Sequence, residues 1–277
     1  MNLTPLSEHI GALVEGVDLS NLSEQEFDAL YQAYLKHKVL FFRDQGMTPQ
    51  QQIGLAKRFG DLEPVHPFFP HLDDEEQVVV IETSPGNPPG ESFWHTDLTW
   101  QATPCRCSIL QALHCPPHGG DTIWTSMEAV WSSLTSDEQH ALQGLTATHG
   151  LHAFEGSRYD SVNEQGESRV ATVSQGYPPV KHPLVVRHPE TGNLTAYVNE
   201  QFTHRINELE ERESRKRLEQ LFALARQPEY QVQFSWQPGS VAIWDNICTQ
   251  HFAVTDYGDQ PRRLHRVTVR GSDLLPA

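Results

Sequence analysis

A series of short segments rich in β-branched and aromatic residues is the sequence feature that most limits the possible folds. These residue types favour a pleated, half-buried backbone. The segments are 77–83, the stretch around Trp94, 107–113, 121–126, 194–199, 230–237, 240–246 and 264–270. Many short strands with helices at the periphery predict a mainly β protein, built as a barrel of the jelly-roll type.

Helices are expected beside these strands. A capping box at 23–26 begins an amphipathic helix, a buried strand follows at 38–44, and a second helix runs from Thr48-Pro49 to Gly60. Further helices are predicted at 126–134, 136–145 and 209–226. No internal repeat or low-complexity linker divides the chain, so residues 1–277 are expected to form a single domain.

One long stretch interrupts the pattern of strands. Between about Gly150 and Gly192 the chain is polar and marked by proline and glycine. Segments of this length without regular structure are usually lids, binding loops or disordered regions. We expect residues 150–192 to form a lid.

The charge balance bears on possible partners. The chain has 36 acidic and 20 basic side chains, and its net charge of -16 disfavours nucleic acid and anionic membranes, because both attract basic patches. No apolar run approaches the roughly 20 residues that span a bilayer, and the N-terminus has none of the features of a signal peptide. We therefore expect a cytoplasmic protein.

The cysteines could be imagined as part of a zinc cluster with His114 and His118. They lack the paired C-x2-C spacing of such clusters, so buried or partly buried thiols are the expected interpretation. The residues concerned are Cys105, Cys107, Cys115 and Cys248.

The sequence FWHTDLTW at 93–100 places an imidazole and a carboxylate two residues apart between bulky aromatics. On a β-strand, His95 and Asp97 would project from one face while Thr96 points away. A second H-x-D triplet at 71–73 lies between a proline and an acidic run, which is typical of a solvated loop. The pair His95 and Asp97, rather than the pair at 71 and 73, is therefore our hypothesis for half of a metal site.

His251, in WDNICTQHFAV, is the candidate for a third ligand. Two histidines and one carboxylate form the facial triad of non-haem Fe(II) oxygenases. Further along, Arg262 and Arg266 share strand parity, so both guanidinium groups should face one side. Buried arginines need anionic partners, and in so acidic a chain we expect the partners to be ligands such as a dicarboxylate cosubstrate.

Two other classes of protein fit parts of this pattern. A zinc hydrolase could use the same two histidines and aspartate to activate a water molecule, but it would not need an inward Arg262. A non-catalytic barrel that binds small anions would keep the arginines without requiring the triad.

The chain resembles the TauD/TfdA family of Fe(II)- and 2-oxoglutarate-dependent dioxygenases, and within it the members that oxidise taurine. The motifs that carry the resemblance span nearly the whole chain: TPLSEHIGALVEGVDL, KVLFFRDQ, VHPFFPH, WHTD, GGDTIWTS, HPLVVRHPETG, YVNEQFTHRI and WDNICTQHFAVTDYGDQPRRLHRVTV. The resemblance implies a double-stranded β-helix, the jelly roll of clavaminate synthase-like enzymes. It also implies a homo-oligomer, a dimer or a tetramer.

The resemblance further implies roles for particular residues. His95, Asp97 and His251 would bind Fe(2+), and Thr122 with Arg262 would hold the distal carboxylate of 2-oxoglutarate. Dioxygen would be the second cosubstrate. Substrate hydroxylation would then be coupled to the decarboxylation of 2-oxoglutarate to succinate.

For the primary substrate, the resemblance implies that His66 and Arg266 bind an anionic group beside the aromatic wall of Phe202. The chain departs from the taurine-oxidising members at Phe69, where they have tyrosine, and at Glu91, where they have asparagine. It also departs at 150–155, where GLHAFE replaces a more polar segment. The expected substrate is a small organic anion, either a sulfonate such as taurine or a sulfate ester. An amino acid or an aryloxyalkanoate is the alternative.

Overall fold

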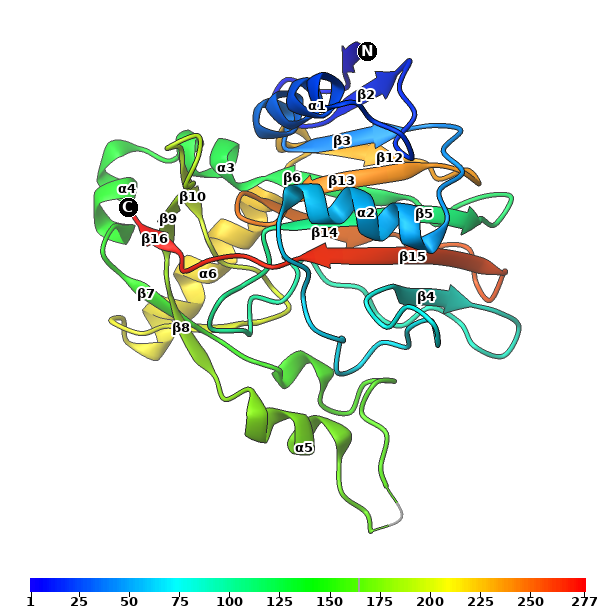
Figure 1. Ribbon diagram of the computed structural model, residues 1–277. Coiled ribbons are helices and arrows are strands. Elements are labelled where there is room, and N and C mark those ends of the chain that lie inside the picture. The colour runs from blue at the N-terminus through cyan, green and yellow to red at the C-terminus, as the bar shows by residue number, and fades with distance from the viewer. Residues whose placement is uncertain (164) are drawn as a thin grey trace.

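The computed structural model describes residues 1–163 and 165–277 (Figure 1). Its largest sheet has seven strands, which pair in an antiparallel manner except for the parallel pair β2 and β3. In spatial order the strands are β1 (Asn2–Pro5), β2 (Ala12–Glu15), β3 (Val39–Phe42), β13 (Val241–Asp245), β5 (Cys107–His114), β15 (Arg262–Val269) and β4 (Val79–Thr83).

A three-stranded sheet packs against one face of this large sheet. Its strands, in order, are β12 (Gln231–Phe234), β6 (Thr122–Ser126) and β14 (Thr249–Ala253). Phe41 of the large sheet stacks on Phe234 of the small one, with ring centroids 4.3 Å apart, and Trp124 packs into the same apolar cluster. Two sheets that share an apolar interior form the jelly roll that the sequence predicts.

The opposite face of the large sheet is covered by α1 (Glu24–His37) and α2 (Pro49–Phe59). Both helices begin with a capping box, which was predicted at Ser23 and which the structure also shows at Thr48. Tyr34 and Phe59 from these helices pack in one core cluster with Ile109 of the sheet.

A second group of elements extends from one end of the two sheets. It contains two small sheets, of order β11-β7-β8 and β10-β9-β16, and three helices that pack around a common apolar cluster. These elements are β7 (Thr146–His149), β8 (Val180–Pro183), β9 (Val185–Arg187), β10 (Leu194–Ala196), β11 (Thr203–Ile206), β16 (Leu275–Pro276), α3 (Met127–Ser133), α4 (Ser136–Leu142) and α6 (Glu211–Ala225). The helices in the described part of the chain are all too short or too polar to span a bilayer.

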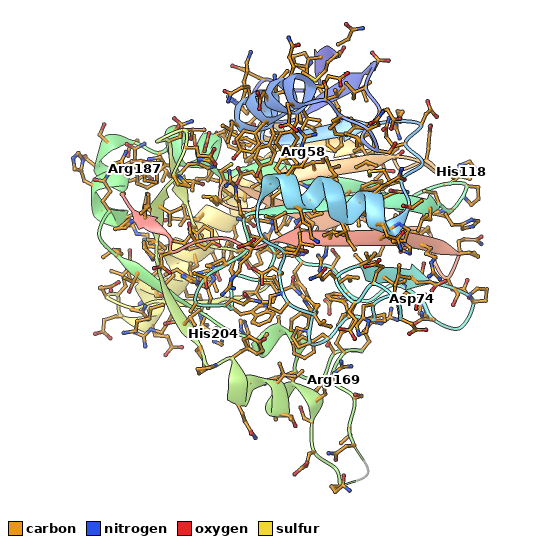
Figure 2. The ribbon with its side chains drawn as sticks, in the orientation of Figure 1. Arg58, Asp74, His118, Arg169, Arg187 and His204 are labelled. Atoms are coloured by element: carbon orange, nitrogen blue, oxygen red, sulfur yellow. The ribbon has the colours of Figure 1, made fainter. Side chains whose placement is uncertain are left out.

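The structure corrects the extent of the stretch expected to lack strands. Strands β8 and β9 lie inside 150–192, where β8 pairs with β7 and β9 pairs with β10 and β16. Before them come a short 3-10 helix, η1 (His152–Phe154), and α5 (Arg169–Gly176). Arg169, labelled in Figure 2, begins α5 at the lower edge of the molecule. Whether 150–192 acts as a lid stays a prediction.

Candidate active site

A cavity of about 330 Å³ opens between the two packed sheets, at the side where 84–92 and 150–163 approach each other. A volume of this size suits a small ligand. Every site residue expected from the sequence lines it: His66, Phe69, Glu91, His95, Asp97, Thr122, Phe202, His251, Arg262 and Arg266. Residues distant in the chain therefore meet in one place.

The segment that carries His95 and Asp97 is not the β-strand expected from its sequence. His95 makes only an isolated bridge to His251, through backbone hydrogen bonds of 3.0 and 2.8 Å. The chain then turns at Asp97, and Leu98 adopts a positive φ of 57°. Thr96 does point away, as expected, since its hydroxyl donates to the carbonyl of Thr249. The bridge between His95 and His251 and the turn at Asp97 therefore place the Asp97 carboxylate near the two imidazoles. The alternation of side chains along a strand does not.

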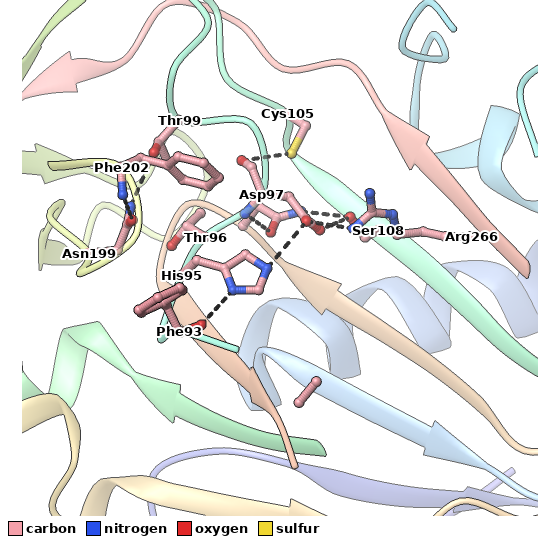
Figure 3. A network of polar contacts seen from close by, with 12 residues as sticks. Phe93, His95, Thr96, Asp97, Thr99, Cys105, Ser108, Asn199, Phe202 and Arg266 are labelled. Carbon is pink, nitrogen blue, oxygen red and sulfur yellow. Dashed lines mark hydrogen bonds and ion pairs between the residues drawn. The ribbon is translucent and has the colours of Figure 1, made fainter. Parts of the chain in front are cut away.

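The three side chains form a compact group of potential metal ligands, with one atom of each within 4.8 Å of the others. His95 Nδ1 donates to the carbonyl of Phe93 at 2.8 Å, which leaves the lone pair of Nε2 on the side of Asp97, 3.9 Å from Oδ1 (Figure 3). The Nδ1 atom of His251 is buried and has no partner among the residues described. A histidine whose second nitrogen donates to a carbonyl is the usual form of a metal ligand, so these residues fit a divalent cation.

The protonation states also suit a cation. Burial lowers the pKa of His95 and lowers that of His251 well below its ordinary value, so both imidazoles are neutral. Burial alone would raise the pKa of Asp97, but the Arg266 guanidinium holds it well below the usual range. The Ser108 hydroxyl adds to this effect by donating to Oδ2 at 2.8 Å. The group therefore offers two lone pairs and a carboxylate.

A second anchor point lies at Arg262, the first residue of β15. Its guanidinium is buried, donates to the carbonyl of Gly120 at 3.2 Å, and leaves Nε without a partner. No carboxylate in the part of the chain described forms an ion pair with it. Burial lowers the pKa of Arg262, although the Tyr257 side chain opposes the shift. A buried cation without a counter-ion fits the carboxylate of a ligand.

Thr122 on β6 faces the same end of the cavity. Its hydroxyl oxygen accepts a 2.9 Å hydrogen bond from Nε1 of Trp236, so its proton is available for another acceptor. Trp236 and Ser108 were missed by the sequence analysis. Nothing in their local sequence distinguishes them from ordinary strand residues, because their roles depend on which strands lie side by side.

His66 is a neutral donor rather than a cation. Its Nδ1 accepts from the backbone N–H groups of Phe68 and Phe69, at 3.1 and 3.2 Å, so the proton belongs on Nε2. Burial, followed by the charge of Arg266, lowers the pKa of His66 to about 3. An anion in the cavity would meet the positive charge of Arg266 and a hydrogen bond from His66.

Aromatic side chains form much of the remaining wall. The ring of Phe69 lies 5.4 Å from the Arg266 guanidinium carbon, and Phe202 meets His95 edge-on with ring centroids 6.2 Å apart. Phe154 contacts Phe202 from the 150–163 segment. Glu91 lines the cavity and is exposed.

The structure offers one other group of metal-ligand types, formed by His188, Asp245 and Cys248. His188 Nε2 donates to Asp245 at 2.9 Å, and Nδ1 accepts from the N–H groups of Glu190 and Thr191. Both ring nitrogens are thus engaged within the protein, which indicates a structural role. Among residues the structure describes, Cys105, Cys107 and Cys115 join no such group.

Comparison with known proteins identifies the family. Residues 2–268 match the family described as taurine catabolism dioxygenase TauD, TfdA family. The chain belongs to this family of dioxygenases. The family assignment agrees with the resemblance seen in the sequence.

Relatives of this dioxygenase cover nearly its whole length. An alkylsulfatase of Acinetobacter baylyi is 34% identical over an alignment of 278 residues that covers 98% of this chain and 85% of that protein. An alpha-ketoglutarate-dependent sulfate ester dioxygenase of Pseudomonas putida is 33% identical over 276 residues, 98% of this chain and 90% of that protein. The crystal structure of a taurine dioxygenase from Burkholderia xenovorans superposes with a TM-score of 0.83 at 34% identity, covering 99% of this chain and 91% of the other. The predicted jelly-roll fold is confirmed.

Proposed function

We propose that this dioxygenase binds Fe(II) through His95, Asp97 and His251 and hydroxylates a small anionic substrate at the expense of 2-oxoglutarate. One observation carries the proposal: three neutral or anionic ligands and the unpaired, buried guanidinium of Arg262 open onto the same cavity. A buried positive charge without a carboxylate partner is costly unless a ligand supplies one. A zinc hydrolase would not need the inward guanidinium of Arg262.

Different residues of the cavity bind the cosubstrate and the substrate. Arg262 and the Thr122 hydroxyl hold one carboxylate of 2-oxoglutarate, while Arg266 and the Nε2–H of His66 orient the anionic group of the substrate. When bound, Fe(II) and 2-oxoglutarate together activate dioxygen, so that a substrate C–H bond is hydroxylated and 2-oxoglutarate becomes succinate and carbon dioxide. The aromatic walls exclude water from the reacting centre.

Among anionic substrates we favour a sulfate ester. The relatives named above include an alkylsulfatase and a sulfate ester dioxygenase. The wall beside Arg266 is aromatic, and Glu91, a carboxylate in the cavity lining, is exposed rather than buried against a substrate amine. Hydroxylation of the carbon that bears the ester oxygen would yield an aldehyde and inorganic sulfate.

The test is turnover of purified protein loaded with Fe(II) under anaerobic conditions and then exposed to air. Short alkyl sulfates, alkyl sulfonates including taurine, aryloxy acids and amino acids would be compared for stimulation of succinate formation. We expect alkyl sulfates to release sulfate and succinate in equal amounts. Protein that forms no succinate with any of these compounds would exclude the proposal.

The same assay separates the alternatives. A zinc hydrolase would release sulfate without oxygen or succinate, and a non-catalytic barrel would bind the anion without turnover. His95→Ala should abolish activity in either enzyme but leave anion binding intact in a non-catalytic protein.

We propose a cytoplasmic protein, and its net charge of -16 argues against nucleic acid and anionic membranes as partners. We also infer that the single domain assembles into a dimer or a tetramer, as its resemblance implies. Gel filtration with light scattering measures the assembly state directly.

A further inference from the structure

The 150–163 segment is fastened to the 84–92 loop by one side chain. Arg158 donates hydrogen bonds to the backbone carbonyl of Pro88 and to Oδ1 of Asn87. Both segments line the cavity, the first through Arg158 and Tyr159 and the second through residues 87 and 89–92. One planar guanidinium therefore joins two walls of the opening, across 71 positions of sequence.

The loop is shaped to receive this side chain at Gly90. A Cβ atom built on Gly90 would lie 2.9 Å from Cδ of Arg158, closer than packed carbon atoms allow. The backbone of Gly90 has no positive φ. Alanine could adopt the same backbone, but its Cβ would force the Arg158 side chain to shift from its present position.

The neighbouring residue carries the connection to the substrate side of the cavity. Tyr159 meets Phe69 at 4.9 Å and Phe154 at 5.8 Å between ring centroids, both edge-to-face. Phe69 in turn lies against the guanidinium of Arg266. The position of Tyr159 thus sets one wall of the space beside Arg266.

A second arginine, in α5 and outside the 150–163 segment, attaches this part of the chain to the loop that carries His66. Arg169, labelled in Figure 2, donates to the carbonyl of Pro67 at 2.6 Å, next to the loop residues His66 and Phe69. This bond does not involve the 84–92 loop. It gives an independent point of attachment against which loss of the Arg158 bridge can be judged.

We propose that Arg158 is a positioning residue that holds the 150–163 segment across the cavity by bridging Asn87 and Pro88, and so keeps Tyr159 against Phe69 over the substrate. The effect of this bridge on catalysis rests on the proposed function, whereas its effect on the structure is independent of that function. The two can therefore be tested separately.

The structural test is amide hydrogen exchange of the full-length protein without substrate, comparing Arg158→Gln, Gly90→Ala and the double variant with the wild type. Loss of hydrogen bonds by a charged group should speed exchange at 84–92 and 150–163 by about threefold to tenfold in each single variant. The double variant should exchange no faster than the singles, because both changes break one bridge. Gly54→Ala is the matched control, since a Cβ there meets nothing within 4 Å. Unchanged exchange in both segments, or additive effects in the double variant, would overturn the proposal.

The kinetic test uses a substrate that the wild type oxidises. Arg158→Gln should raise KM for that substrate about fivefold or more, with KM for 2-oxoglutarate unchanged. With ascorbate present as the two-electron reductant for unproductive turnovers, it should also yield more succinate than oxidised product, because the substrate is held less firmly. Arg158→Lys, which cannot reach both acceptors at once, should recover only part of the affinity. Equal rises in both KM values, or full rescue by lysine, would rule out the bridge. A wild type without any turnover would count against the proposed function alone, since the exchange test still decides the bridge.

Discussion

Nη1 of Arg266 lies 2.6 Å from Oδ1 of Asp97, and both side chains are buried. The pair links the candidate metal group to the side of the cavity assigned to the substrate anion. The guanidinium holds Asp97 ionised, but its charge also opposes any cation that approaches the same carboxylate. Arg266 therefore influences metal binding and substrate binding in opposite directions.

Replacing Arg266 with methionine should make this opposition measurable. We expect the metal-free variant to lose about 3 to 5 kcal/mol of stability, because the buried Asp97 carboxylate is left without a counter-ion. Divalent cations should restore more stability than in the wild type, and the dissociation constant for Co(II) should fall about tenfold. Calorimetry and thermal unfolding with and without Co(II) measure both effects. Weaker Co(II) binding in the variant would contradict the prediction. Arg263→Met, which removes an outward arginine paired with Glu82, is the control.

Replacing Arg262 with methionine should affect the metal-free protein in the opposite way. The guanidinium is buried without a counter-ion, so the variant should unfold at the same temperature as the wild type or at a higher one. The stabilisation that 2-oxoglutarate gives the metal-loaded wild type should disappear, and KM for 2-oxoglutarate should rise about 30-fold or more. A marked loss of stability without ligand would mean that Arg262 has an internal structural role instead.

Trp236 offers a milder test of the same end of the cavity. Trp236→Phe removes the Nε1–H donor to Thr122 and keeps most of the aromatic volume. Losing one buried hydrogen bond costs about 1 kcal/mol, so KM for 2-oxoglutarate should rise about fivefold with little change in kcat. Steady-state kinetics at saturating substrate measure the change. An unaffected KM for 2-oxoglutarate would separate Thr122 from the cosubstrate.

The low pKa of His66 predicts a specific pH dependence of stability. Its folded pKa is about 3, below the ordinary value of 6.5, so the folded protein prefers the neutral ring. The stabilisation is fully present above pH 6.5 and is lost as the pH falls towards 3, with a slope of at most about 1.4 kcal/mol per pH unit. Denaturant unfolding of metal-free protein should therefore show a steeper loss in the wild type than in His66→Gln. Parallel curves would show that His66 is protonated as easily in the folded protein as in the unfolded one.

The sequence predicted most regular elements because the information is local. The capping boxes at Ser23 and Thr48 need only neighbouring residues, and the shared parity of Arg262 and Arg266 follows from the two-residue period of a strand. The resemblance to the TauD/TfdA family predicted that His95, Asp97 and His251 belong to one site. The strand expected around Trp94 was wrong, because a turn at Asp97 and Leu98 replaces it.

By itself, then, the sequence determined the jelly-roll class, the identity of the candidate ligands and the presence of two inward arginines. Only the tertiary structure decided that Arg266 pairs with Asp97, that Ser108 and Trp236 support the site, and that Arg158 reaches Asn87 and Pro88. The physical reason is the range of the interactions. Capping and strand alternation act between near neighbours, whereas these contacts join side chains up to 169 positions apart and exist only after the sheets have packed.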